Sequence, residues 1–415
     1  MTAPNVRVLY IAYWGACEPL GQSLLVPSVT QLATCGANVR LVSFEKPEGL
    51  RDRAAVNRMA TALEEANVKW TRLTYHKHPK WPATAFDILH GCARGISAGF
   101  RNRYDVVHAR TFIGGIIGRC VAHAMGAAFV YHAEGFYPDE QVDAGVWRRD
   151  SAAHRLASYI DRILYATADG IIVLSHKARE VLWQDRLIDN KAGRAIVVPS
   201  CVDLRRFTGL KTRVLNPADQ LKLVHCGNVR GRYYGEKIAQ WFAAIRRQCA
   251  NAHLTFLTHE DPVLVGALCR DADLPDGSWS VKSIPHSEIP HELPKYDAGI
   301  LFLRRGLSER GVSPTKVGEY WACGLPVLAT SHVGDNDEWV VRHRIGVIVN
   351  DHSEQGYANS ALQLLELLKD PNIRQRCREA AESHYGLRPA CERQVELYRE
   401  VLARRQAVLQ VSHAR

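Results

Sequence analysis

A lysine and a glutamate stand three residues apart at the start of an expected helix, in the stretch Ser313-Pro-Thr-Lys-Val-Gly-Glu. Ser313 is the expected N-cap, Pro314 suits the first helical position, and Gly324 is expected to end the helix. Lys316 in the first turn faces the positive end of the helix dipole, which is favourable only if an anion such as phosphate binds there too. Glu319 shares that helix face, and its carboxylate could accept hydrogen bonds from two hydroxyls of a ribose. The stretch therefore predicts a site for a phosphate and a sugar diol, with an ordinary amphipathic helix as the alternative.

Length and composition indicate a globular chain of more than one domain. Its 415 residues exceed what a single core usually supports, so two domains are expected. Hydrophobic residues make up 47% and charged residues 23%, which is typical of a soluble protein. No apolar run reaches the roughly 18 residues of a membrane-spanning helix, and the N-terminus has no secretory signal pattern. Eleven cysteines without C-x-x-C spacing indicate reduced thiols, a cytoplasmic location and no structural zinc site.

The formal net charge of +10 predicts an anionic partner. Nucleotide phosphates, an anionic membrane face and nucleic acid are the candidates, but the basic residues are dispersed and form no nucleic-acid-binding motif. Nucleic acid is therefore not expected. The cluster Tyr75-His-Lys-His-Pro-Lys-Trp81 suits peripheral contact with an anionic membrane, with a solvated loop as the alternative. The 18 histidines show no H-E-x-x-H or similar spacing, so no metal site is predicted.

Strand-like and helix-like segments alternate along the first half of the chain. Short apolar or β-branched runs predict strands at Val6–Tyr13, Asn38–Glu45, Lys69–Tyr75, Asp105–Ala109, Ala128–Tyr131, Gly170–Leu174 and Ala195–Pro199. Segments of helical period between them predict helices that include Ser23–Cys35, Arg53–Ala66, Ala85–Phe100, Phe112–Met125 and Ser151–Ala168. This alternation is typical of parallel strands joined by crossover helices, the α/β class.

The alternation resumes after a polar stretch from Asp203 to Pro217, which we interpret as part of a linker. Further strands are predicted at Leu221–Cys226, His253–Leu257, Trp279–Ile284, Ala298–Leu303, Val327–Thr330 and Gly346–Val349. The expected organisation is a first domain at 1–200, a linker at 201–218, a second domain at 219–388 and a C-terminal helix at 389–415 that packs back on the first domain. Ligands of two such sheets would bind beyond the carboxyl ends of the strands, in a cleft.

Five separated motifs occur in an order known from one enzyme family. Val197–Phe207 is similar to an interdomain signature V-P-N-G-V-D followed by phenylalanine, and Leu223–Arg232 to the strand and glycine loop that open a nucleotide domain. Asp105–His108 and Val130–Gly135 are similar to two histidine-bearing strand ends, and Ser313–Pro326 to the variant S-P-x-K-x-x-E-Y followed by G-x-P-V. Together they make the chain resemble the GT-B glycosyltransferases of the family 4 type, which transfer a sugar from a nucleotide donor with retention of configuration. The resemblance covers nearly the whole chain and implies two Rossmann-like domains whose parallel sheets face a central cleft.

This resemblance implies a donor site in the second domain. Glu319 stands at the second glutamate of the family's E-x7-E element and would contact the donor ribose, whereas the first glutamate falls at Gly311 and Glu309 stands two positions away. The family binds the pyrophosphate with an arginine and a lysine. The candidates here are Arg230, Arg232 and Lys237, and the spacing does not choose among them; a solvated basic turn is the alternative. The implied donor-binding residues are Gly15, Gly21, Gly227, Arg230, Arg232, Lys237, Ser313, Thr315, Lys316 and Glu319.

The same resemblance assigns residues of the first domain. His132 falls where the family has a histidine near the transferred sugar, and an imidazole at a strand end can donate a hydrogen bond to a sugar hydroxyl. This strand end reads H-x-E-G where close relatives often have D-x-R-G, so the roles of His132 and Glu134 stay open. His108 is expected to be a packed group behind the site. Glu134, Asp139 and Glu140 are expected to face the acceptor. For Asp139 and Glu140 the alternative is that they cap the following segment.

Retaining transfer in this family is thought to need no protein nucleophile, because the donor β-phosphate takes the acceptor proton while the sugar leaves from the same face. Cations and helix amides would stabilise the diphosphate leaving group, so His132, Lys316 and Arg230 are the expected catalytic residues. Asp271-Ala-Asp273 matches the letters of a metal-binding D-x-D motif but is interpreted as a helix end. Activity without a metal or other cofactor is therefore expected. The implied donor is a UDP- or GDP-sugar and the acceptor a glycan or lipid-linked glycan, in surface polysaccharide synthesis in the cytoplasm or at the inner membrane face.

Other functions match parts of the pattern. A nucleotide-sugar 2-epimerase of the same fold is one alternative, since fold does not determine function. A phosphorylase would need a pyridoxal lysine and usually a much longer chain. A non-enzymatic two-domain ligand-binding module is a further alternative, but such proteins are usually exported and no signal is seen here. A dinucleotide dehydrogenase is disfavoured because no G-x-G-x-x-G follows the strand Val6–Tyr13.

Overall fold

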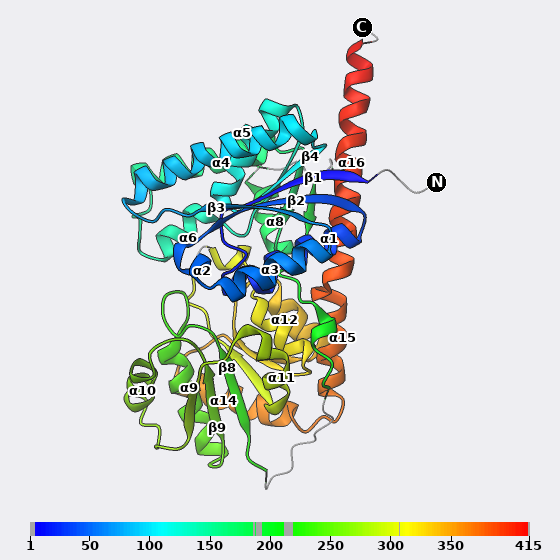
Figure 1. Cartoon of the computed structure of the whole chain (residues 1–415). Helices are drawn as coiled ribbons and strands as arrows, with labels where there is room; N and C mark the ends of the chain where they lie inside the picture. The colour runs from blue at the N-terminus through cyan, green and yellow to red at the C-terminus, as the bar shows by residue number, and fades with distance from the viewer. Residues whose placement is uncertain (1–4, 186, 188–192, 211–218, 307, 414–415) are drawn as a thin grey trace. The chain divides into compact units, whose positions relative to one another are not determined.

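The computed structural model describes residues 5–185, 187, 193–210, 219–306 and 308–413, which form two compact units (Figure 1). The first unit comprises Met1–Val142, Trp147–Pro199 and Leu387–Arg415, and the second comprises Asp143–Val146 and Ser200–Gly386. Part of the expected linker, residues 211–218, lies outside the described residues. Its described beginning belongs to the second unit and contains the short 3-10 helix Leu204–Arg206.

The first unit is built on a parallel sheet of seven strands in the order β3-β2-β1-β4-β5-β6-β7. The strands are β1 Val6–Ala12, β2 Ala37–Glu45, β3 Lys69–Thr74, β4 Val106–Arg110, β5 Ala128–His132, β6 Gly170–Val173 and β7 Ala195–Val197. Every residue of β4, β5 and β6 is buried, because helices cover both faces of the sheet. Near-continuous apolar runs are what such doubly covered strands require.

Helices cover this sheet, and all but the last of them connect its strands. They are α1 Val26–Thr34, α2 Pro47–Arg51, α3 Arg53–Glu65, α4 Lys80–Asn102, α5 Phe112–Met125, α6 Tyr137–Asp143, α7 Ala152–Thr167, α8 His176–Gln184 and α16 Leu387–His413. The long helix α16, red in Figure 1, closes the chain and packs against α1, β1, β5 and β6 of this unit. The expected helix Ser23–Cys35 is in two parts, because a π-helical turn at Gly21–Leu25 precedes α1.

The second unit is built on a parallel sheet of six strands in the order β10-β9-β8-β11-β12-β13. The strands are β8 Lys222–Cys226, β9 His253–Leu257, β10 Trp279–Lys282, β11 Ala298–Leu301, β12 Val327–Thr330 and β13 Gly346–Val349. The helices are α9 Gly235–Gln248, α10 Pro262–Asp271, α11 Ile289–Glu292, α12 Thr315–Ala322, α13 Asn336–His343, α14 Glu354–Leu367 and α15 Ile373–Tyr385. One hydrophobic cluster, with α12 and α15, and another, with α9, α10 and α14, cover the sheet.

The prediction of two parallel, Rossmann-like sheets is confirmed. In each unit the order runs outward from a central pair, β1 and β4 in the first and β8 and β11 in the second. Ligands of doubly wound sheets bind at the carboxyl ends of the strands beside such a reversal of strand order. Among the described residues, no helix is both long and apolar enough to cross a bilayer.

Candidate functional site

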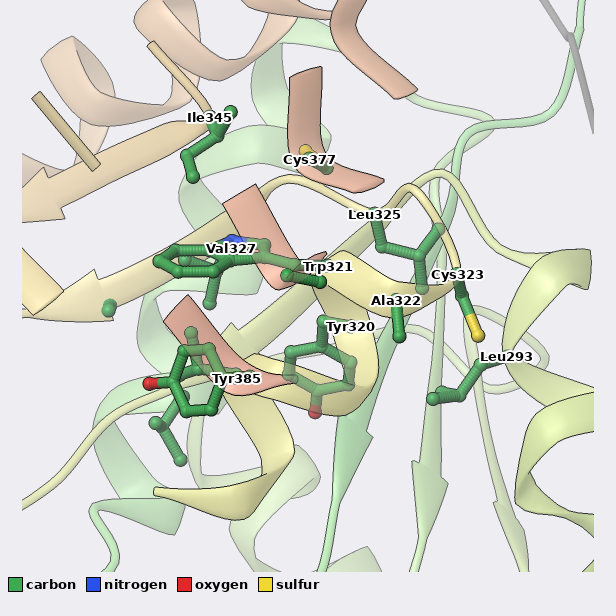
Figure 2. Close-up of a cluster of buried hydrophobic side chains, with 14 of the residues drawn as sticks. Leu293, Tyr320, Trp321, Ala322, Cys323, Leu325, Val327, Ile345, Cys377 and Tyr385 are labelled. Carbon is green, nitrogen blue, oxygen red and sulfur yellow. The ribbon is translucent and has the colours of Figure 1, made fainter. Parts of the chain in front are cut away.

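The helix α12 is anchored at the carboxyl ends of the two central strands of the second unit. The hydroxyl of Tyr320 accepts a hydrogen bond from the backbone N–H of Cys226, 2.9 Å away, and donates to the carbonyl of Ile300 at 3.4 Å. Figure 2 shows Tyr320 and Trp321 packed among buried side chains that include Tyr385 and Val327. The apolar face of α12 thus fixes its N-terminal turn beside the ends of β8 and β11.

The start of α12 differs from the expected cap. The helix begins at Thr315 with Pro314 as N-cap, one position later than expected, and the prediction that Ser313 is the N-cap is wrong. The hydroxyl of Ser313 instead accepts a hydrogen bond from the backbone N–H of Ser200, 3.2 Å away. A proline N-cap offers no side chain to the first amides of the helix, so those of Thr315 and Lys316 remain available to an external anion.

Lys316 extends from this first turn to the end of β8. Its ammonium donates to the hydroxyl of Tyr233 at 2.8 Å and lies 4.9 Å from the centre of the same ring. Gly227, with φ of +103°, leaves the space that the lysine stem occupies, because a Cβ there would lie 2.4 Å from Lys316 Cε. Burial acts to lower the pKa of Lys316, but Tyr233 and the carboxylate of Glu319 raise it overall. The lysine is therefore a fixed positive charge, which suits a phosphate.

Glu319 lies one turn further along α12 and is buried. Its Oε1 is 2.9 Å from Nε2 of His286, which stands in the 3-10 turn after β10. Sequence reasoning missed His286, although its place just after an expected strand end was a usable signal. A carboxylate has room for several hydrogen bonds, so Glu319 could hold a ribose hydroxyl while His286 orients it.

Basic side chains border this position. Arg230 forms an ion pair with Glu260 at 2.9 Å, and it is exposed. Arg304, which sequence reasoning also missed, stacks over Tyr234 and donates to the carbonyl of Gly231 at 2.9 Å. Arg230 and Arg232, two of the three pyrophosphate-binding candidates from the sequence, belong to the same loop as Tyr233, the partner of Lys316.

Lys237 is placed differently from the two arginines, because it lies in the first turn of α9 and donates to Gln240 at 3.0 Å. Glu309, the candidate replacement for the absent first glutamate, is buried in the 3-10 turn Ser308–Gly311. Burial raises the pKa of its carboxyl, and the charge of Arg232 opposes that rise. A buried carboxylate beside an arginine is a suitable acceptor for sugar hydroxyls.

In the first unit, two histidines lie on neighbouring strands, His108 in the middle of β4 and His132 at the end of β5. His108 Nε2 lies 3.1 Å from His132 Nδ1, and His108 Nδ1 lies 2.5 Å from the hydroxyl of Tyr398 on α16. His132 Nε2 is buried and has no hydrogen-bond partner among the described residues. Burial, and to a smaller extent the charge of Arg110, lowers the pKa of both imidazoles well below 6.5, so both rings are neutral at pH 7.

The chain of three groups determines where the imidazole protons lie. A phenol hydroxyl is a better hydrogen-bond donor than an imidazole N–H, and an imidazole nitrogen is a better acceptor than a phenol oxygen, so we assign the Tyr398 hydroxyl as the donor to His108 Nδ1. A neutral imidazole carries one hydrogen, which in His108 must then be on Nε2 and is donated to His132 Nδ1. The hydrogen of His132 consequently lies on Nε2, the atom without a partner. His132 is thereby preset as a hydrogen-bond donor.

The carboxylates expected on the acceptor side have partners within the protein. Glu134 accepts from Nε of the buried Arg110, whose guanidinium also stacks over Trp14. Burial raises the pKa of Glu134, and the charge of Arg110 opposes that rise. Asp139 and Glu140 lie in the first turn of α6, where acidic residues interact well with the helix dipole. Asp139 is also 3.8 Å from Nε2 of His154.

The glycine loop after β1 is organised by a carboxylate at the end of β2. Glu45 accepts from the backbone N–H groups of Ala16, at 2.8 Å, and Cys17, at 3.1 Å. A Cβ on Gly15 would lie 2.6 Å from Glu45 Oε2, and one on Gly21 would lie 1.9 Å from the carbonyl oxygen of Gly15. Close packing within the loop thus already requires both glycines, and two of its amides are bound internally.

Known proteins share this architecture. Residues 29–206 match the family model described as Glycosyltransferase Family 4. Sucrose-phosphate synthase from Thermosynechococcus elongatus superposes with a TM-score of 0.69 and 16% identity, covering 96% of this chain and 100% of that one. Anabaena HepE in complex with UDP gives a TM-score of 0.66 and 14% identity, covering 94% and 99%. A search of curated protein sequences gives no match.

The chain has a GT-B fold. Its two parallel sheets and the coverage of whole glycosyltransferase structures agree on this point. A structure from Listeria monocytogenes named as a UDP-N-acetylglucosamine 2-epimerase also superposes, with a TM-score of 0.59 and 13% identity, covering 94% of this chain and 95% of that one. The family match falls mostly in the first unit of this GT-B chain, whereas Lys316 and Glu319 lie in the second.

Proposed function

We propose that this protein is a retaining glycosyltransferase that takes a hexosyl group from a UDP- or GDP-sugar bound by its second unit. The observation that carries the proposal is the arrangement of Lys316, Tyr233 and Gly227 at the N-terminus of α12, beside Glu319. It combines a fixed cation, helix amides and a buried carboxylate at the end of the central strands. These are the groups that a nucleoside diphosphate requires. The family match and the UDP bound by Anabaena HepE support this assignment.

Each group then has a role in the transfer. Lys316, the amides of Thr315 and Lys316, and the loop arginines Arg230 and Arg232 would hold the diphosphate and stabilise the charge that develops as it leaves. Glu319 would accept from the ribose, and Glu309 from the sugar. The acceptor oxygen bonds to the anomeric carbon as the bond to the β-phosphate oxygen breaks, and the acceptor proton passes to that phosphate. We assign no metal to this step.

The first unit would serve the sugar and the acceptor. His132 would donate its Nε2 hydrogen to a sugar oxygen, which would give this buried group its missing partner. Glu134, Asp139 and Glu140 are the acceptor-side candidates. We propose a glycan or lipid-linked glycan as the acceptor, in the cytoplasmic synthesis of a surface polysaccharide.

A nucleotide-sugar 2-epimerase is the second candidate function, favoured by the structural similarity to the Listeria protein. Product analysis separates the two activities. An epimerase converts the nucleotide sugar with no acceptor present, whereas a transferase releases the nucleoside diphosphate and forms a new glycoside only with its acceptor.

The first experiment is a binding screen of UDP-, GDP-, ADP- and dTDP-sugars by calorimetry, in the presence of a chelator. We expect saturable binding of one nucleotide class, and its loss in Lys316→Met and Glu319→Gln. The matched control is the exposed pair of Glu366, in the last turn of α14, and Lys369, just after that helix, which has the same residue types and the same three-residue separation. Lys369→Met and Glu366→Gln should leave binding unchanged. Absence of binding by every nucleotide sugar would refute the proposed function.

A further inference from the structure

The helix α4 exposes a row of large apolar side chains. Trp81, Phe86, Leu89 and Phe100 are 61%, 54%, 70% and 78% exposed, respectively. Pro82, Ala85 and Ala93 lie exposed among them. We call these seven residues the α4 apolar face. Large apolar groups that gather on one side of a surface helix, rather than occurring singly, indicate an interaction site.

Packing of the first unit does not require this face. The opposite side of α4 is lined by Gly91, Gly95 and Gly99, one on each successive turn, and all three are buried. A Cβ at Gly91 would lie 2.9 Å from Ile117 Cδ1, and one at Gly95 would lie 2.7 Å from a methyl of Val121, both on α5. Contact between α4 and α5 therefore depends on glycines. Ile88, Cys92 and Ile96 of α4 pack against the core, and Trp81 stacks on Trp147 with ring centroids 6.2 Å apart, whereas Leu89 and Phe100 remain exposed.

The charges that accompany the apolar face are all positive. Lys80, Arg94 and Arg101 of α4 are exposed, and Arg103 follows directly after the helix. The one acidic residue of α4, Asp87, is buried and accepts from the hydroxyl of Tyr13 at 2.9 Å. The solvent side of this helix thus combines aromatic and aliphatic groups with basic groups and carries no acidic group.

We propose that the α4 apolar face binds the surface of a lipid bilayer that contains anionic headgroups, with the helix lying in the plane of the interface. Aromatic and leucine side chains on one face and basic residues at its edges are the features by which such helices bind. Each basic residue is attracted to the negative surface potential, and Trp81 suits the headgroup level. The sequence placed Trp81 in a basic loop, whereas the structure places it at the start of α4, so the contact extends along the helix.

Charge complementarity favours a bilayer over a second copy of the chain. Two copies paired through this face would bring Arg94 and Arg101 of each near those of the other, with no exposed acid on α4 to compensate. An anionic lipid surface supplies the missing negative charge over the whole length of the helix. The proposal goes beyond the proposed transferase activity and does not depend on the nucleotide site.

The test is sedimentation of the full chain with vesicles of phosphatidylcholine alone and of phosphatidylcholine mixed with phosphatidylglycerol. We expect binding to the anionic vesicles and not to the neutral ones. Leu89→Glu with Phe100→Glu should weaken that binding by about tenfold or more, since two apolar anchors are lost. Arg94→Gln with Arg101→Gln should weaken it by a similar factor of about ten or more. The matched control is Val263→Glu with Val341→Glu, whose side chains are each 71% exposed in the second unit.

Three results would overturn the proposal. The wild-type chain could fail to bind anionic vesicles, or the Leu89→Glu and Phe100→Glu variant could bind them as well as the control does. The wild-type chain could also form dimers that this variant abolishes while neither binds vesicles, which would assign the face to self-association. Nucleotide binding, measured on the same samples, reports the donor site separately and should be equal in all variants.

Discussion

Replacing Tyr398 by phenylalanine should change the tautomer of a histidine that it does not touch. The hydroxyl of Tyr398 donates to His108 Nδ1, and His108 in turn donates to His132, so the hydrogen of His132 lies on Nε2. Without the hydroxyl, nothing at His108 Nδ1 distinguishes the two possible orders of donation. We therefore expect Tyr398→Phe to mix the two tautomers of His132 while leaving both rings neutral.

The magnitude follows from the difference in strength between the two possible hydrogen bonds at His108 Nδ1. In the reverse order His108 Nδ1–H donates to the Tyr398 oxygen and the hydroxyl hydrogen has no acceptor among the described residues, whereas in the forward order the His132 Nε2 hydrogen has none. The two orders thus leave the same number of buried donors without a partner, and the strength of the bond at His108 Nδ1 decides between them. A phenol hydroxyl is a better donor than an imidazole N–H, and an imidazole nitrogen is a better acceptor than a phenol oxygen. A difference of about 1 kcal/mol between the two bonds favours the forward order by about fivefold. In the phenylalanine variant this preference disappears, and the fraction of His132 with hydrogen on Nε2 falls to about one half.

Nitrogen NMR of histidine-labelled protein measures this directly, because protonated and unprotonated ring nitrogens have distinct shifts. If His132 donates to the substrate, kcat should fall to about half while KM for the donor stays unchanged. Tyr165→Phe is the matched control, because the Tyr165 hydroxyl is also buried in the first unit but has no hydrogen-bond partner among the described residues. Finding the hydrogen on Nδ1 of His132 in the wild type, or the same tautomer in wild type and Tyr398→Phe, would refute the reasoning.

Three further predictions concern single side chains. Lys316→Met should weaken UDP or GDP binding by about 10- to 150-fold, because a charge-assisted hydrogen bond is lost. Tyr233→Phe keeps the charge of Lys316 and should weaken binding by less than about tenfold. Equal losses of affinity in calorimetry would contradict this prediction. Gly227→Ala should reduce the affinity for UDP or GDP and also the stability to urea, because the φ of Gly227 is +103° and the added Cβ would contact Lys316. The control Gly277→Ala, at φ +80° with no neighbouring atoms around the added Cβ, should reduce stability alone. Burial raises the pKa of Asp161 from 3.8 to about 7, so the folded state binds its proton more tightly than the unfolded state does and wild-type stability falls as pH rises through that range. Asp161→Asn should remove this pH dependence. In urea titrations, the free energy of unfolding of the variant relative to wild type should therefore rise by up to about 4 kcal/mol between pH 4 and pH 8. A difference that does not change with pH would contradict the raised pKa of Asp161.

The α/β class and most elements could be predicted from the sequence because they depend on local pattern. The helix Phe112–Met125 and the strands His253–Leu257, Val327–Thr330 and Gly346–Val349 were predicted with the bounds that they have. Apolar runs and helical period reflect burial of each segment, and this information is contained within a few residues. The start of α12 was predicted one residue early, because Ser313 is engaged by Ser200, a residue from a distant part of the chain.

The sequence by itself also placed Lys316 and Glu319 together, since residues three apart on one helix share a face. Only the tertiary structure decided what these side chains contact. Tyr233 reaches Lys316, and His286 reaches Glu319, because strand order brings the ends of β8, β10 and β11 to one edge of the sheet. Tyr398 reaches His108 across 290 residues because α16 packs against the first sheet. Such contacts depend on how separate elements pack, and no local pattern in the chain encodes them.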